Sequence, residues 1–280
     1  MNPNPPYNIF DLLPKEHLAM HQQFRVGFGK KVVLLHGLGS SGRYWNEPSN
    51  HLLNKYQLIS YDLLGFGESE KPAPYSYYLW QQADALRQAM WIDHMWGKVN
   101  LVGHSLGALV ALEFAKRYPK KVNKLVLCNI PLILSKKQAS TIKERYSDVA
   151  DNIRNELHRK SLKTIRHSKL VQEKLMPHYA ERKKEEGVFK NYDLEHLSRY
   201  AYLQSIKHSI ENYAGLEGLE GVQAETFVIA ADKDRAVIKS NTNKLINALP
   251  KAKLIEVAGT HQFPVLQPKE FAKRLKLCLG

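Results

Sequence analysis

Cysteine is nearly absent from this chain of 280 residues, which contains only Cys128 and Cys278. Their separation matches no metal-binding or redox spacing. Cys128 also falls within an apolar run that is typical of a core strand. We therefore expect two reduced thiols, as in a cytoplasmic protein, and no bound metal ion.

Long apolar runs are also missing. No segment approaches the roughly 18 consecutive apolar residues of a membrane-spanning helix. Residues 1–7, MNPNPPY, have neither the basic region nor the apolar stretch of a secretory signal. The sequence thus predicts no integral membrane association.

Acidic residues are scarce relative to basic ones. The chain holds 27 Asp and Glu against 41 Lys and Arg, which gives a formal net charge of +14. Such a charge raises nucleic acid or a membrane surface as a partner. The basic residues are scattered, however, and accompany no nucleic-acid motif, so we expect a solvated basic surface and no nucleic-acid partner.

What the sequence does contain is a series of short apolar runs separated by helical segments. Runs rich in Val, Ile and Leu suit parallel strands that are covered on both faces, and their alternation with helices indicates right-handed crossovers. This pattern predicts an α/β fold with a mostly parallel, doubly wound sheet. The expected strands are residues 31–36, 57–61, 99–103, 124–128, 226–230 and 253–257.

The alternation breaks in the middle of the chain. Residues 134–213 are highly charged and helical in pattern, with Leu194, Leu197, Ala201, Leu203 and Ile206 roughly on one face. We interpret them as a helical cap inserted into a single α/β core made of residues 1–133 and 214–280. A separate interaction module is the alternative.

One serine stands between a predicted strand and a predicted helix. Residues 103–107 read Gly-His-Ser-Leu-Gly, directly after the strand and before the apolar helix of residues 108–117. Flanking glycines permit a sharp turn that presents the Ser105 hydroxyl, and the helix N-terminus points its amides toward developing negative charge. This context predicts a nucleophile, with His104 packed beside it.

The first glycine-rich loop, residues 37–42, allows two interpretations. Its G-x-G-x-x-G pattern follows a strand and precedes Asp62 by 20 residues, as in a dinucleotide-binding fingerprint. Residues 43–48 intervene, however, before a helix that we expect to start near Pro48. We favour an oxyanion loop with the Leu38 amide as donor, braced by His36, and expect Asp62 to shape its own loop.

A serine hydroxyl needs a base to remove its proton and a carboxylate to orient that base. Asp232 and Asp234 follow one predicted strand, and His261 follows the next. Both strands end at the edge where open α/β sheets assemble their sites. The pattern predicts a triad of Ser105, His261 and one of the two aspartates.

Together these motifs resemble the α/β-hydrolase superfamily, in its branch of single-chain esterases and C–C-bond hydrolases. Residues 36–39 with Trp45 are similar to its oxyanion loop, residues 61–69 to its D-x-P-G-x-G-x-S loop, and residues 259–264 to its histidine loop. Residues 231–234 resemble its acid turn, which implies Asp234 as the acid. The resemblance also implies Leu38 and Leu106 as oxyanion donors. The remaining substrate-binding candidates are His36, Gly37, His104 and Trp45.

The predicted function is hydrolysis of a small-molecule carboxylic ester through an acyl-enzyme, without metal or cofactor. Serine at the nucleophile position disfavours haloalkane dehalogenases and epoxide hydrolases, which the resemblance associates with aspartate there. The alternatives are hydrolysis of a C–C bond in a dicarbonyl metabolite and acyl transfer or peracid formation. A non-catalytic ligand-binding protein and an NAD-dependent oxidoreductase are the candidates from other classes.

Overall fold

The computed structural model describes residues 18–140, 193, 196–211 and 215–280. Seven strands form one sheet in the order β1-β3-β2-β4-β5-β6-β7. Only β1 is antiparallel, to β3, and the other neighbours pair in parallel. This confirms the predicted α/β fold with its mostly parallel sheet. The strands are β1 Gln22–Val26, β2 Lys30–Leu35, β3 Tyr56–Tyr61, β4 Val99–His104, β5 Val122–Cys128, β6 Glu225–Ala231 and β7 Ala252–Val257.

All six predicted strands are present, and their ends shift by at most two residues. The strand that the sequence did not reveal is β1, whose residues QQFRV are half-buried or exposed. As an edge strand it needs no continuous apolar run, so it carried no signal that could be distinguished from a loop.

The strand order creates a switch point at the centre of the sheet. From β2 the chain moves to β3 on one side, whereas β4 pairs with the other side of β2. The connections that leave β2 and β4 therefore diverge, which opens a crevice beyond the carboxyl ends of these two strands. The glycine-rich loop after β2 and Ser105 after β4 thus lie at the same crevice.

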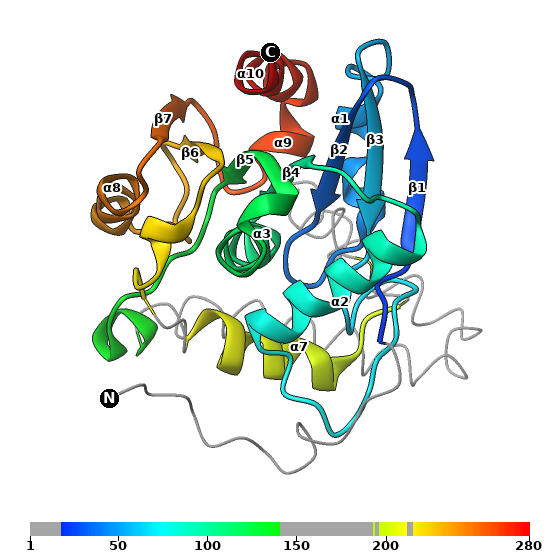
Figure 1. Ribbon diagram of the computed structural model, residues 1–280. Helices are drawn as coiled ribbons and strands as arrows, with labels where there is room; N and C mark the ends of the chain where they lie inside the picture. Colours follow the sequence, from blue (N-terminus) through cyan, green and yellow to red (C-terminus); the bar gives the residue numbers. More distant parts are fainter. Residues whose placement is uncertain (1–17, 141–192, 194–195, 212–214) are drawn as a thin grey trace, which may run out of the picture.

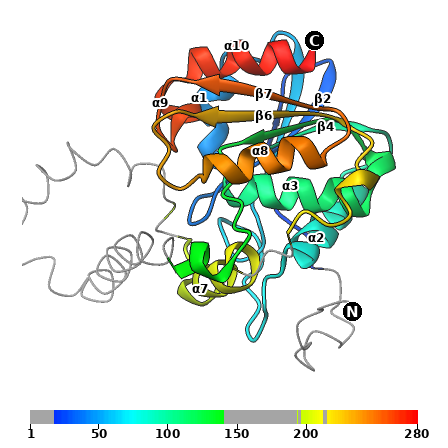
Figure 2. The ribbon, with the colours of Figure 1, turned by 90° about the vertical axis from the view of Figure 1, so that its left-hand side faces the viewer.

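Helices cover both faces of the sheet (Figures 1 and 2). On one face lie α2 Leu79–Ile92, α3 Leu106–Arg117 and α8 Lys239–Ala248; on the other lie α1 Asn46–Ser49, α9 Phe263–Leu266 and α10 Pro268–Leu279. Adjacent residues of β4 point to opposite faces of the sheet. Leu101 packs into the apolar core under α2 and α3, whereas Val102 packs into the core under α10. The central strands are therefore buried on both faces, as their apolar runs predicted.

The helical segment after β2 starts earlier than the sequence suggested. A 3-10 helix at Gly42–Trp45 runs directly into α1, so Pro48 lies within the helix and does not open it. Among the described residues, no helix is long and apolar enough to cross a membrane.

Most of the predicted cap, including Leu194, lies outside the described residues. The described part contains α7 Arg199–Ser205, which is continued by a π-helical segment at Ile206–Ile210. Ala201, Tyr202 and Ser205 are buried there, but Leu203 is 44% exposed. Leu203 stands about 200° around the helix from Ala201, so its assignment to the apolar face was wrong.

Candidate active site

Ser105 lies in a strained turn between β4 and α3. Its φ of 53° and ψ of −119° are unusual for a residue that is not glycine. The turn is crowded by backbone: a side chain at Gly103 would meet the carbonyl of Gly107, and one at Gly107 would meet the carbonyl of Leu35. The two glycines are therefore required sterically for the strand and helix to meet so tightly at the serine.

Ser105, His261 and Asp234 form one hydrogen-bonded chain. The distance from Ser105 Oγ to His261 Nε2 is 2.9 Å, and that from His261 Nδ1 to Asp234 Oδ2 is 2.7 Å. The Asp234 carboxylate accepts a hydrogen bond from Nδ1, so the proton of the neutral imidazole lies on Nδ1. Nε2 is then free to accept a hydrogen bond from the serine hydroxyl. The structure thus brings together the three residues that the sequence assigned to the triad.

Asp234 rather than Asp232 contacts the histidine. The Asp234 side chain has no exposed surface, and its second oxygen accepts from the Ala236 amide at 2.7 Å. Asp232 is instead exposed and accepts from the Gly259 amide at 2.8 Å. That hydrogen bond lowers the pKa of Asp232 and ties the turn after β6 to the loop that carries His261. The two aspartates therefore have different structural roles.

The glycine-rich loop lies directly against the serine. A side-chain atom at Gly37 would come within 3.2 Å of Ser105 Cβ. His36, which is fully buried, accepts from the Leu63 amide at its Nε2 (2.9 Å) and has its Nδ1 2.8 Å from the Gly37 carbonyl oxygen. It therefore braces this loop against the loop after β3, and its burial lowers its pKa and keeps it neutral. Leu106 opens α3, where a backbone N–H has no partner within the helix.

His104 and Asn129 together hold the backbone of His261. His104 Nε2 donates to the carbonyl oxygen of His261 at 2.8 Å, and Asn129 Nδ2 donates to the same oxygen at 2.9 Å. Burial and the neighbouring His261 keep the pKa of His104 well below its ordinary value, so its ring is neutral. The His104 ring also stacks on Tyr44, at 4.8 Å between ring centroids. We call His104 and Asn129 the carbonyl clamp.

Asn129 is a site residue that the sequence analysis missed. It follows β5 directly, has a positive φ of 50° and accepts from the Ala231 amide at 2.9 Å through its side-chain oxygen. It therefore connects the ends of β5 and β6 with the histidine loop. The rule that singled out the triad residues, a polar residue at the carboxyl end of a parallel strand, applies equally to Asn129.

Trp45 does not lie at the site. Its side chain is fully buried in the core on the α10 face, with its ring 5.6 Å from that of Phe271. The prediction that it contacts substrate is corrected, because a residue enclosed on this side of the sheet cannot reach the crevice. His36, Gly37 and His104 are near Ser105 but support the site from behind, since the two histidines have almost no exposed surface.

Asp62 shapes its loop, as we expected. Its carboxylate is buried and accepts from the amides of Gly42, at 2.6 Å, and Glu68, at 2.8 Å. Both oxygens are thus engaged by backbone and not presented to a ribose, which favours the oxyanion interpretation of the glycine-rich loop over the dinucleotide interpretation.

A polar cluster connects the described part of residues 134–213 with the glycine-rich loop. The Asp193 amide donates to the Gly39 carbonyl at 3.1 Å, and the Asp193 side chain lies 2.9 Å from His196, whose other ring nitrogen is 2.9 Å from Glu68. Arg43 lies within 3.8 Å of Asp193 and 3.6 Å of Glu68. Burial raises the pKa of Asp193, but hydrogen bonds from His196 and Ser41 outweigh it and leave that pKa lowered.

Comparison with known proteins places the chain in a family. The model of the alpha/beta hydrolase fold family matches residues 30–267. The chain belongs to the α/β-hydrolase fold family. This confirms the resemblance noted from the sequence and the expectation that the chain is an enzyme.

Curated relatives of this α/β-hydrolase match only part of its sequence. A Klebsiella pneumoniae protein whose name describes it as a provisional carbamate hydrolase is 42% identical over 104 residues, which cover 37% of this chain and 39% of the relative. The curated relatives are matched over 30% to 39% of their own length.

Two solved structures resemble this α/β-hydrolase over nearly the whole chain. An enol-lactonase from Burkholderia xenovorans has a TM-score of 0.68 and 21% identity, covering 93% of this chain and 96% of its own. A bromoperoxidase from Bacillus anthracis has a TM-score of 0.73 and 23% identity, covering 93% and 99%. At such identities the likeness shows a common fold.

Proposed function

We propose that this α/β-hydrolase cleaves carboxylic esters of small to medium acyl chains through an acyl-enzyme on Ser105. The observation that carries the proposal is the continuous hydrogen-bonded chain from Ser105 Oγ through His261 to Asp234. A serine, a base on its hydroxyl and a buried carboxylate on the base are the parts that acyl transfer requires.

In the first half-reaction, Ser105 Oγ attacks the ester carbonyl carbon while its proton passes to His261 Nε2. The imidazolium is stabilised by Asp234, which accepts from Nδ1 at 2.7 Å. The tetrahedral intermediate then expels the alcohol, which takes the proton from His261 Nε2. An acyl-Ser105 ester and a neutral histidine result.

The oxyanion of that intermediate needs donors beside Ser105. We assign this role to the amides of Leu38 and Leu106, one from the glycine-rich loop and one from the first turn of α3. The closeness of Gly37 to Ser105 supports the assignment: a Cβ atom at Gly37 would lie 3.2 Å from Ser105 Cβ, so the loop lies against the nucleophile. A donor of this kind contributes about 3–4 kcal/mol to transition-state stabilisation.

In the second half-reaction, His261 Nε2 removes a proton from a water molecule as that water attacks the acyl carbon. The tetrahedral intermediate then breaks its bond to Ser105 Oγ and releases the acid, while His261 returns the proton to Ser105 Oγ. The second half-reaction differs from the first in its nucleophile, which is water in place of Ser105. The carbonyl clamp holds the histidine backbone through both steps, while the neutral His104 ring adds no second positive charge beside the imidazolium.

The acyl preference is proposed to reside in residues 134–213, which we interpret as a cap over the carboxyl edge of the sheet. Two observations on the described residues support this. Figure 2 shows α7 near the end of the sheet toward which β6 and β7 point. The Asp193 amide also bonds to Gly39 in the proposed oxyanion loop. The enol-lactonase named above acts, by its name, on a cyclic ester, which agrees with ester hydrolysis here.

Reaction with a fluorophosphonate and turnover of p-nitrophenyl esters of increasing chain length test the proposal. The wild type is expected to be labelled stoichiometrically, and Ser105→Ala to lose labelling and about 10⁶-fold in turnover. Ser49→Ala is the matched control, because Ser49 is also buried but lies in α1. More than a few per cent of wild-type turnover in Ser105→Ala would exclude Ser105 as the nucleophile.

We further propose that the enzyme works in the cytoplasm. Cys128 and Cys278 are both buried free thiols, and burial raises the pKa of each. Buried, protonated thiols without a disulfide suit a reducing compartment.

A further inference from the structure

The C-terminal end of α2 and the loop after it expose a cluster of large apolar side chains. Trp91 is 59% exposed, Trp96 57% and Ile92 47%. The two indole rings meet edge to face, with 6.0 Å between their centroids. A contiguous apolar surface of this kind on a soluble domain marks a contact with another molecule.

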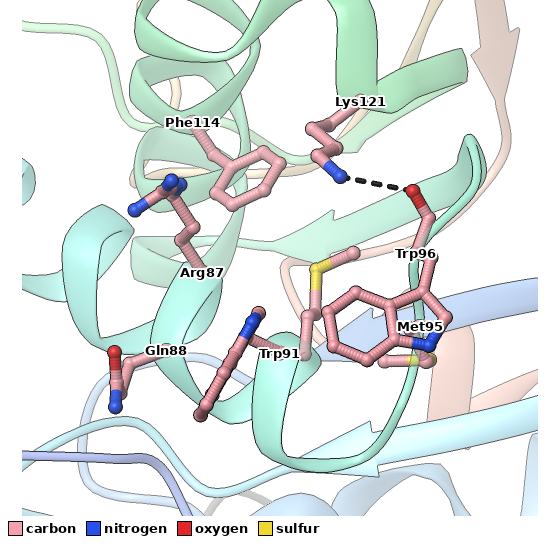
Figure 3. A pocket seen from close by; sticks show the side chains of 8 residues that line it. Arg87, Gln88, Trp91, Met95, Trp96, Phe114 and Lys121 are labelled. Carbon is pink, nitrogen blue, oxygen red and sulfur yellow. Dashed lines mark hydrogen bonds between the residues drawn. The ribbon is translucent and has the colours of Figure 1, made fainter.

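A cavity of about 270 Å³ lies between these rings and α3 (Figure 3). Buried Met95 and Phe114 form part of its wall, and Arg87 and Lys121 are the cationic side chains that line it. Lys121 Nζ donates to the Trp96 carbonyl oxygen at 2.9 Å, which holds the loop against the start of β5. We define the basic tryptophan patch by its members, Arg87, Trp91, Ile92, Trp96, Lys98, Lys120 and Lys121.

The charge around this patch is positive. Residues 84–98 and 113–121 hold six basic and three acidic side chains. Two ion pairs cancel within this set, Asp84 with Arg117 at 3.1 Å and Glu113 with Lys116 at 3.5 Å, which leaves four basic side chains against Asp93. Arg87, Lys98 and Lys120 are exposed. Arg87 lines the cavity together with the tryptophans, Lys98 is two residues from Trp96, and Lys120 precedes Lys121, which bonds to Trp96. Two copies of the chain that met through this patch would oppose like charges, so the charge favours an anionic partner.

We propose that the basic tryptophan patch is a docking surface for a membrane that contains anionic phospholipids. Tryptophan rings settle at the level of the lipid headgroups, where their apolar body and polar N–H are both accommodated. Lysine and arginine side chains nearby extend their charged ends to the headgroups and are attracted by anionic lipid. The patch offers both features on one exposed surface.

The docked orientation follows from the topology. Trp96 precedes β4 and Lys121 precedes β5, whereas Ser105 follows β4. The patch and the crevice therefore lie at opposite ends of the same strands. A membrane against the patch leaves Ser105 facing water, so docking localises the enzyme without covering its active site.

Co-sedimentation of the full chain with vesicles tests this proposal without reference to catalysis. The wild type is expected to sediment with vesicles of phosphatidylcholine and phosphatidylglycerol, not with phosphatidylcholine alone, and to be released by salt. Trp91→Ala with Trp96→Ala is expected to weaken binding about tenfold or more. Lys98→Gln with Lys120→Gln should weaken it about fivefold for each lysine.

Matched controls use similar side chains elsewhere. Leu277, which is 67% exposed on α10, and Lys244, which is exposed on α8, are replaced by Ala and Gln, and binding should be unchanged. Thermal denaturation shows whether each variant is folded. Absence of wild-type binding to the anionic vesicles, or equal loss in the control and patch variants, would overturn the proposal. It would also be overturned if ultracentrifugation showed a dimer that only the tryptophan variants disrupt, because the patch would then join two copies of the chain.

Discussion

Replacing Asn129 by alanine tests whether the carbonyl clamp positions the catalytic histidine. The change removes the hydrogen bond from Asn129 Nδ2 to the His261 carbonyl and leaves the Ala231 amide without its acceptor. Asn129 Nδ2 also donates to the Thr260 carbonyl, at a longer 3.3 Å. The two shorter hydrogen bonds at about 1 kcal/mol each, with up to about 2 kcal/mol for the unpaired amide, give a loss of stability of about 2–4 kcal/mol.

The catalytic effect should be separate from this destabilisation. With only His104 left on its carbonyl, the His261 loop can shift, and a displacement of about 1 Å in a catalytic group costs up to about 100-fold. We therefore expect kcat for p-nitrophenyl acetate, and the rate of fluorophosphonate labelling, to fall about 10–100-fold. KM should change little, because Asn129 is fully buried and cannot contact substrate.

Asn241→Ala is the matched control for Asn129→Ala. Asn241 is also a buried asparagine that donates to a backbone carbonyl, that of Leu132 at 2.8 Å, but it lies on α8. It should be destabilised to a similar extent and retain its kcat. If Asn129→Ala lost as much stability as Asn241→Ala and kept the wild-type kcat, the clamp would be structural only.

Three further outcomes are expected. Asp234→Asn should lower kcat about 10⁴-fold through loss of the correct histidine tautomer, whereas Asp232→Asn should be mild; the reverse ranking in a steady-state assay would contradict the assignment. His36 and His104 have lowered pKa values in the folded state and take up protons only on unfolding. The free energy of unfolding should therefore be at its full value above pH 6.5 and should decrease as the pH falls below 6.5. Each contributes a slope of about 1.4 kcal/mol per pH unit, and an unchanged slope in His104→Gln would refute this reasoning. In urea unfolding, Tyr202→Ala should lower the free energy of unfolding by about 3 kcal/mol, because Tyr202 is only 2% exposed. Leu203→Ala should lower it by less than about 0.5 kcal/mol, and equal losses would show that α7 is packed differently.

Much of the fold and of the candidate site could be predicted from local pattern. Central strands of a parallel sheet are buried on both faces, so β2 to β6 are recognisable as apolar runs. The edge strand β7 is largely exposed, but its short apolar pair Leu254 and Ile255 was enough to predict it. The edge strand β1 and the start of the helix at Gly42 lacked such a pattern and were missed. The serine was recognisable because the turn between β4 and α3 admits only glycine at positions 103 and 107.

What the sequence by itself determined, then, is which residues follow strands and so reach the carboxyl edge of the sheet. It could not determine which of those residues meet, because that depends on the order of the strands and on the directions of hydrogen bonds in the turns. Asp232 and Asp234 stand two residues apart, yet one bonds to Gly259 and the other to His261. The sequence marks Asn129 as a polar residue at the end of a strand, but only the structure shows that it bonds to both the Ala231 amide and the His261 carbonyl. Trp45 is near the glycine-rich loop in sequence, yet its side chain lies in the core between the sheet and α10. Only the fold brings α10 to that face of the sheet, where the apolar ring is buried.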